Sequence, residues 1–180
     1  MDFISHQCCG ESYSHLFRYL LFDHAGQFRT YNITKNEWVL GGDTVVYSSW
    51  ESIRDTLDYD FAQEKQFSYD ALSVPDSIRH IAKFASGIWQ IHPFCEGNTR
   101  ATAVFIVKYL KTFGFTVNND VFAANSWYFR NALVRANYND LQHNVHETTE
   151  YLELFSTVTP SVKNSFSRYA IGFFSAGGRI

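Results

Sequence analysis

The sequence has few cysteines, no excess of positive charge and no long apolar run. Its three cysteines, Cys8, Cys9 and Cys95, have no paired spacing, so neither a disulfide framework nor a zinc site is expected. Lys and Arg total 15 against 18 Asp and Glu, and the net charge of −3 gives no field that attracts nucleic acid. No stretch of about 18 apolar residues occurs, and residues 1–6 lack the pattern of a secretory signal. We therefore expect a cytoplasmic protein that binds neither nucleic acid nor membranes.

Large apolar side chains, by contrast, are abundant. Hydrophobic residues make up 46% and aromatic residues 18% of the 180 residues, which is enough to bury a core and excludes disorder as the default. No internal repeat, low-complexity tract or linker interrupts the middle of the chain. The sequence therefore predicts a single domain over residues 1–180, in which the Ser- and Gly-rich segment 156–180 has no clear periodicity.

Apolar spacing predicts a mainly α-helical fold. One helix is predicted to begin at Pro75 and to end before His92, because a residue that precedes proline disfavours α geometry. Residues 101–107 are apolar on almost every side, as in a helix at the centre of a fold. Helical spacing also occurs in three further ranges, 13–21, about 123–136 and about 144–155.

One segment has the pattern of β structure. β-branched and aromatic residues run from Phe28 to Tyr47, and they are interrupted at Lys35-Asn36 and at Gly41-Gly42. The pattern predicts a short hairpin or flap.

The residues best suited to chemistry lie together between two predicted helices, at positions 92–100, His-Pro-Phe-Cys-Glu-Gly-Asn-Thr-Arg. The free N–H groups at a helix start favour an anion, and Gly97 lets the backbone approach phosphate oxygens. Arg100 offers a planar fork of donors to phosphate, and Glu96 can hold Mg²⁺. A neutral His92 can take the proton of an attacking hydroxyl. The loop therefore predicts phosphoryl or nucleotidyl transfer.

This loop resembles the signature of the Fic family, H-P-F-x-[D/E]-G-N-G-R-x-x-R. The matching positions are His92, Pro93, Phe94, Glu96, Gly97, Asn98 and Arg100. The resemblance covers about residues 12–155 and includes Phe22 to Arg29 and Asn32 to Lys35. It implies a Fic-type helical core with a short β-hairpin flap that docks the target segment as an added strand. The docking residues of the flap would be Thr34, Lys35, Val39 and Leu40.

The resemblance implies a protein adenylyltransferase, which transfers AMP from ATP to a Tyr, Thr or Ser hydroxyl of a target protein and releases pyrophosphate. His92 would be the general base, Phe94 would pack under the loop, and Glu96 would bind Mg²⁺ on the α- and β-phosphates. The residues that hold the phosphates would be Gly97, Asn98, Thr99 and Arg100. Besides the target protein, an inhibitory antitoxin is a partner that the family allows, and delivery into another cell stays open.

Two positions depart from the signature. Position 99 is Thr, where adenylylating relatives usually have Gly and the related Doc toxins, which phosphorylate, have Lys. Position 103 is Ala, where the fuller signature has a second Arg, so one contact to the γ-phosphate is missing. In many Fic proteins that Arg pairs with the Glu of an inhibitory motif, [S/T]-x-x-x-E-[G/N], of which residues 149–154 and 167–172 are incomplete copies. We hypothesise that no glutamate of this chain restrains it.

Three functions remain open on this pattern. They are adenylylation, Doc-like phosphorylation or transfer from another nucleotide, and a binding module with a decayed site. The aromatic residues Trp127, Tyr128, Phe129 and Tyr138 fit an adenine pocket or the core, and the core is favoured. Asn139-Asp140 fits a turn near the nucleotide or a turn alone, and the other histidines have no ligand spacing.

Overall fold

The fold is described from a computed structural model. It describes residues 26–158 except 71, 114, 116 and 118, so the helix predicted over 13–21 and the segment after residue 158 lie outside the described residues. That residues 1–180 form one domain stays a prediction. The helices are η1 (Trp38–Leu40), η2 (Trp50–Ser52), α2 (Ile53–Gln66), α3 (Val74–Ile91), α4 (Asn98–Thr112), α5 (Asp120–Ala124), α6 (Ser126–Arg135) and α7 (Glu150–Val158).

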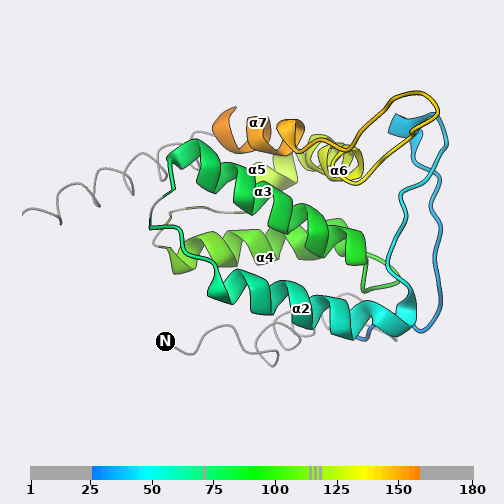
Figure 1. Ribbon diagram of the computed structural model, residues 1–180, viewed down its shortest axis with the longest axis horizontal. Coiled ribbons are helices and arrows are strands. Elements are labelled where there is room, and N and C mark those ends of the chain that lie inside the picture. The colour runs from blue at the N-terminus through cyan, green and yellow to red at the C-terminus, as the bar shows by residue number, and fades with distance from the viewer. Residues whose placement is uncertain (1–25, 71, 114, 116, 118, 159–180) are drawn as a thin grey trace, which may run out of the picture.

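Helix α3 lies at the centre of the arrangement and contacts α2, α4 and α7 (Figure 1). Helices α6 and α7 pack against each other on the side of α3 away from α2. The flap, residues 28–47, lies at the same end of the molecule as the loop that joins α3 to α4. The fold therefore brings together the two segments that the sequence analysis selected.

Helix α3 confirms the prediction made from Pro75 and His92. The Ser73 side chain caps the helix by accepting a hydrogen bond from the Asp76 backbone N–H, and Pro75 lies in the first turn, where its missing N–H costs nothing. The helix ends at Ile91, and His92 takes a left-handed conformation with φ 50°. The apolar repeat of α3 faces inward along its length, which places the end of the helix firmly against the core.

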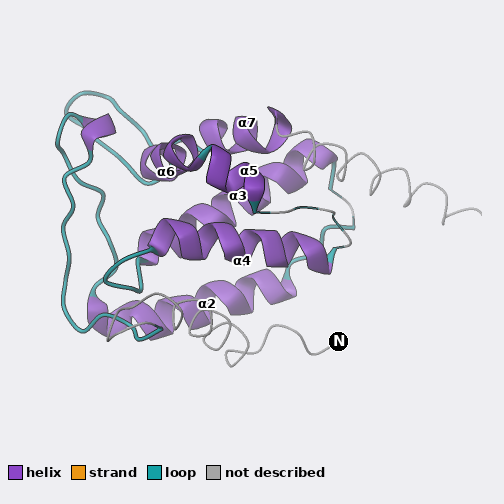
Figure 2. Cartoon of the chain, turned by 180° about the vertical axis from the view of Figure 1, so that it is seen from behind, coloured by secondary structure: helices purple, strands orange, loops and turns teal. Residues whose placement is uncertain are grey.

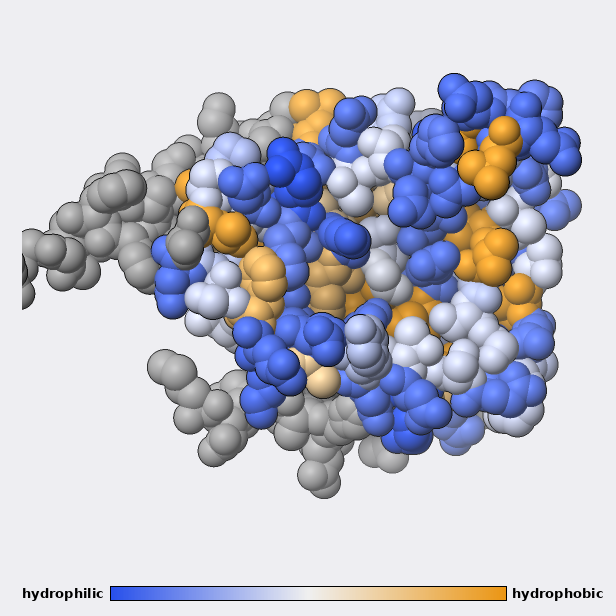
Figure 3. Space-filling view, in the orientation of Figure 1, coloured by the Kyte–Doolittle hydropathy of each residue, from blue (hydrophilic) through white to orange (hydrophobic). Residues whose placement is uncertain are grey.

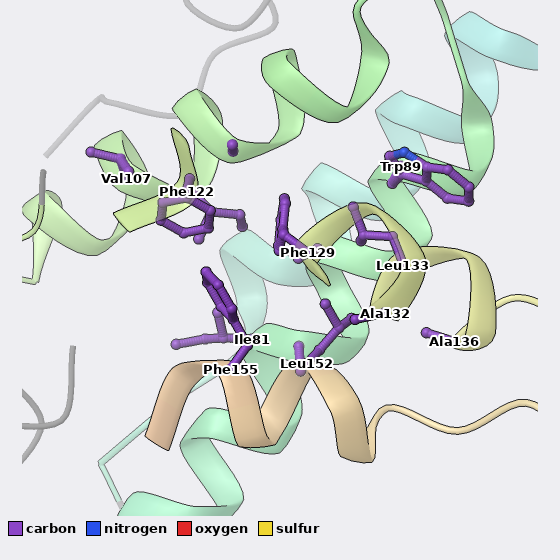
Figure 4. Close-up of a cluster of buried hydrophobic side chains, with 14 of the residues drawn as sticks. Ile81, Trp89, Val107, Phe122, Phe129, Ala132, Leu133, Ala136, Leu152 and Phe155 are labelled. Carbon is purple, nitrogen blue, oxygen red and sulfur yellow. The ribbon is translucent and has the colours of Figure 1, made fainter. Parts of the chain in front are cut away.

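The main core joins α3, α4, α6 and α7 (Figure 4). Its largest fully buried side chain is Trp89, and α6 contributes Leu133 and Phe129 to the same core. Helix α4 buries Ala103, Ile106, Val107 and Leu110, while Val104 and Phe105 are half-buried, in agreement with the prediction of a helix at the centre of the fold. Among the aromatic residues considered for an adenine pocket, Phe129 is a core residue, whereas Trp127 is 65% exposed.

The helical predictions missed one helix, α2, and two of the predicted ranges need correction. The helix expected at about 123–136 is divided at Asn125 into α5 and α6. The helix expected at about 144–155 begins only at Glu150, because Asn144 has a left-handed φ of 55° and Val145 pairs with Asp140 in an isolated β-bridge.

The predicted β-hairpin over 28–47 is not formed, and no β-strand occurs among the described residues (Figure 2). Two extended arms are joined by η1 and closed only at its base, where Glu37 and Asp43 are hydrogen-bonded through their backbones. Elsewhere the backbone groups of the arms form no ladder with each other, and some of them bond to other elements. The Arg29 N–H donates to the Pro93 carbonyl, and the Gln90 side chain donates to the Val46 carbonyl.

Hydrophobic side chains also reach the surface near the end that carries the flap (Figure 3). Val46 of the flap is 79% exposed and Leu141 is 77% exposed. Among the helices of the described chain, none combines the length and the hydropathy needed to cross a membrane.

Candidate functional site

The imidazole of His92 lies at the end of α3 and is only 4% exposed. Its Nδ1 atom is 3.2 Å from the Trp89 carbonyl oxygen. Because a carbonyl oxygen can only accept, Nδ1 carries the proton in the neutral ring. The lone pair is therefore on Nε2, which is the atom that can act as a base.

Tyr47 of the flap covers the imidazole. The two rings are in contact, with centroids 4.2 Å apart and their planes tilted by 42°. The Tyr47 hydroxyl donates to Oε1 of Glu37 at 3.1 Å, and Oε2 of the fully buried Glu37 is 2.7 Å from Nη1 of Arg130 on α6. The sequence analysis missed all three residues, because nothing in their local pattern shows that they meet.

The charge state of His92 follows from this burial. Burial lowers the pKa of His92 to about 3, and the positive charge of Lys35 is the next largest cause, with smaller effects in the same direction from Arg29 and Arg130. The hydrogen bond to the Trp89 carbonyl acts in the opposite direction and is weaker. The imidazole is therefore neutral throughout the physiological range, as a base must be.

This pKa makes stability depend on pH in a defined window. An unfolded chain protonates this histidine near pH 6.5, whereas the folded chain keeps it neutral down to a pH of about 3. Stability is thus fully present above pH 6.5 and falls as the pH falls, by up to roughly 1.4 kcal/mol per pH unit from this group. In urea unfolding experiments between pH 6 and 4.5, we expect the free energy of unfolding of His92→Gln to fall less steeply with falling pH than that of wild type. His146→Gln, which changes an exposed loop histidine, should keep the wild-type slope. Equal slopes for His92→Gln and wild type would contradict the expectation.

Arg29 holds the flap to the end of α3. Its side chain is 2% exposed, and it donates to the carbonyl oxygens of His92 at 2.8 Å and Tyr31 at 2.8 Å. It also donates to the carbonyl oxygens of Ser48 and, at 3.3 Å, Ile91. The sequence analysis did not assign Arg29 a role, although it lies in the stretch from Phe22 that resembles Fic sequence. Its position between Phe28 and Thr30 gave no local signal that the side chain is buried.

Asn98 shapes the loop from within. Its side-chain oxygen accepts from the Phe94 N–H at 2.9 Å, and its side-chain nitrogen donates to the Phe94 carbonyl at 2.7 Å. The Phe94 ring is buried beside Ala101 and the ring of Phe28. The Asn98 side chain therefore holds the loop closed through both the N–H and the carbonyl of Phe94. The middle of the loop, from Cys95 to Gly97, stays near solvent.

The N-terminus of α4 has the features of an anion site. Gly97 is its N-cap, with φ 79°, and no side chain caps the first turn. The hydroxyl of Thr99 accepts a hydrogen bond from Nε1 of Trp89 at 3.0 Å, so it is turned back toward α3. Arg100 is exposed on the same turn. Uncapped N–H groups, the helix dipole and a nearby guanidinium together favour a phosphate.

Glu96 is the carboxylate that the loop offers to a metal, and its side chain is 73% exposed. No group of three or more His, Cys, Asp or Glu within the described residues could hold a metal by itself. Mg²⁺ commonly binds through one carboxylate together with substrate phosphates and water, and a single exposed Glu96 fits that mode.

The four residues predicted to dock a target fall into two groups. Thr34 is exposed and Lys35 is partly buried, with its Nζ 3.9 Å from Oε1 of Glu96. Val39 and Leu40 lie in η1 and pack half-buried against the main core. The structure therefore brings Lys35 to the loop and turns Val39 and Leu40 toward the core.

A neutral histidine, an exposed carboxylate and an uncapped helix N-terminus in one loop are features of proteins that act on phosphate esters. A sequence profile of the Fic/DOC family matches residues 7–110, more than half of the chain. The chain belongs to the Fic/DOC family. A comparison with curated proteins gave no match.

Two solved structures share the fold. One is the N-terminal FIC domain of a VirB-translocated effector protein from Bartonella sp. 1-1C, with a TM-score of 0.57 and 17% identity over 81% of this chain and 70% of that one. The other is a FIC domain containing signaling protein from Bacteroides thetaiotaomicron, with a TM-score of 0.58 and 12% identity. That match covers 96% of this chain and 64% of the other, so this chain spans less than two thirds of it. At these identities the likeness concerns the fold alone.

Proposed function

We propose that the chain transfers AMP from ATP to a hydroxyl of a target protein. The observation that carries the proposal is the placement of a neutral His92, with its lone pair on Nε2, in the same short loop as the uncapped N-terminus of α4. Membership of the Fic/DOC family supports the same class of reaction.

The chain's own residues have separate parts in this reaction. Nε2 of His92 takes the proton of the acceptor hydroxyl as its oxygen bonds to the α-phosphorus. The bond from the α-phosphorus to the bridging oxygen breaks, and pyrophosphate leaves with the electron pair. The first turn of α4 and Arg100 hold phosphate oxygens, and Asn98 keeps the loop in shape. Positioning and charge neutralisation supply most of the rate enhancement.

Glu96 would hold the Mg²⁺ that accompanies the nucleotide. The metal would supply positive charge to the phosphates between which the bond breaks. The remaining parts of the proposed reaction are assigned to side chains and backbone groups of the loop and of α4.

Labelled nucleotide tests this proposal directly. The protein is incubated with Mg²⁺, a cell lysate and ATP labelled at either the α- or the γ-phosphate. The proposal expects α-label on protein, and mass spectrometry should find an added AMP. Transfer of the γ-label in place of the α-label would mean phosphorylation, and the absence of both labels would mean either transfer from another nucleotide or a binding module. Either result would refute AMP transfer.

A further inference from the structure

Lys35 lies where the flap meets the loop between α3 and α4. Its Nζ is 3.9 Å from Oε1 of Glu96, and its side chain is 29% exposed, against 73% for Glu96. An ion pair at this distance with one largely exposed partner contributes only about 0–1 kcal/mol, so it can separate at little cost. The contact is therefore a weak link between two elements, in contrast to the buried bonds of Arg29.

Lys35 also acts electrostatically on His92. Among the neighbouring charges, that of Lys35 has the largest effect on the pKa of His92, ahead of Arg29 and Arg130. The ammonium group therefore adjoins Glu96 and lies within electrostatic reach of the histidine. Phosphates bound to a metal on Glu96 would lie near this ammonium group.

The other cations around the site have partners already. Arg29 is bonded to backbone carbonyls, and Arg130 is paired with the buried Glu37. Position 103 is an alanine buried in the main core, so it brings no cation to the phosphates. Besides Arg100, the described cation that adjoins the loop and has only a weak, exposed partner is Lys35.

We propose that Lys35 binds the polyphosphate of the nucleotide, and that the Lys35–Glu96 pair opens when the magnesium nucleotide enters. The inference rests on the proposed function and assigns Lys35 to the nucleotide, whereas the resemblance assigned it to target docking. Each charge of the broken pair gains a partner of opposite sign, since Glu96 meets the metal and Lys35 meets phosphate oxygens. The exchange leaves no charge unpaired, which makes it favourable.

Equilibrium binding of α,β-methylene-ATP with Mg²⁺ tests this on the full chain without turnover, because its bridging carbon cannot be cleaved. We expect Lys35→Met to weaken binding about ten-fold or more, the effect of one charge-assisted hydrogen bond. Lys35→Arg should stay close to wild type. The matched control is Lys111→Met, an exposed lysine in the last turn of α4, which should not change the affinity. Tripolyphosphate with Mg²⁺, used as a competitor, should lose affinity in Lys35→Met by the same factor.

A second arm uses metal-free analogue. Glu96→Gln should tighten its binding, because Lys35 is released from its partner, and adding Lys35→Met should cancel that gain. Thermal unfolding midpoints of all variants should match wild type within about 2 °C, since an ion pair as long as this one contributes little to stability.

The outcomes separate the two proposals. If wild type binds the analogue and Lys35→Met binds it equally well, the inference is wrong while the proposed function stands. A raised KM for the target with unchanged nucleotide affinity would return Lys35 to docking. A gain in Glu96→Gln that persists in the double variant would also overturn the inference. If wild type binds no magnesium nucleotide at all, the proposed function fails and the inference falls with it.

Discussion

Replacing His92 with alanine is expected to lower the rate of AMP transfer by about 10²–10⁴-fold, the usual contribution of a general base. The reason is that Nε2 carries the lone pair that can accept a proton, while Nδ1 is held by the Trp89 carbonyl. Affinity for magnesium nucleotide should change by less than about two-fold, because the base acts on the acceptor hydroxyl. Initial rates of α-label transfer and equilibrium binding measure the two quantities separately.

The control for this prediction must keep the fold. His92 is packed between Tyr47 and Trp89, so alanine leaves a space there. His92→Gln fills more of that space and still lacks an imidazole, and it should be as inactive as His92→Ala. His146→Gln changes a histidine on an exposed loop and should transfer AMP at the wild-type rate. If either His92 variant kept more than about a tenth of the wild-type rate, a different group would have to be the base.

Replacing Arg29 with methionine is expected to be the most destabilising single change at the site. It removes donors to the carbonyl oxygens of His92, Tyr31, Ser48 and Ile91, at a position where water has little access. Buried acceptors without partners cost about 1–3 kcal/mol each, so the free energy of unfolding should fall by about 3 kcal/mol or more. Urea unfolding at pH 7.5 measures it.

The Arg29→Lys variant separates the effect of the positive charge from that of the planar guanidinium geometry. A lysine keeps the charge but lacks the planar fork, so it can reach fewer of these carbonyls at once. Arg29→Lys should therefore lie between methionine and wild type in stability. Arg79→Met is the matched control, since Arg79 is 58% exposed and its ion pairs should contribute less than about 1 kcal/mol. Equal stabilities of Arg29→Met and Arg79→Met would show that Arg29 does not clamp the flap.

The parts of the fold predicted correctly depend on local signals. Helix α3 has a serine cap, a proline in its first turn and apolar residues at helical spacing, and its end follows from Pro93 acting on the residue before it. The family signature is local as well, because the nine residues from 92 to 100 are contiguous. Short-range patterns therefore located both the loop and the helix that presents His92.

The parts that were missed depend on contacts between distant residues. Helix α2 has a narrow apolar stripe, at Ile53, Leu57 and Phe61, and the stripe continues into the buried carboxylate of Glu64. That carboxylate is buried because Tyr69 and Tyr109 donate to it and His80 lies 2.6 Å away, on other elements. Periodicity in one segment cannot reveal such partners.

The flap was mispredicted for the same reason. Alternating β-branched residues predict strand pairing, but here the backbone groups of the arms find partners in α3 and the loop after it. Burial of Glu37 against Arg130 and packing of Val39 and Leu40 turn the tip of the flap toward the helices. Tertiary contacts thus override a local preference for strand.

The buried Glu37 carboxylate makes the surroundings of His92 depend on a helix outside the signature. Without Arg130, an unpaired charge would remain in the interior, at a cost of several kcal/mol, and the flap would have to swing outward to return it to water. Tyr47 would leave with it, because its hydroxyl is bonded to that same carboxylate. The surroundings of His92 therefore depend on Arg130 of α6, and a substitution of Arg130 is expected to be tolerated better when Glu37 is also replaced by a neutral residue.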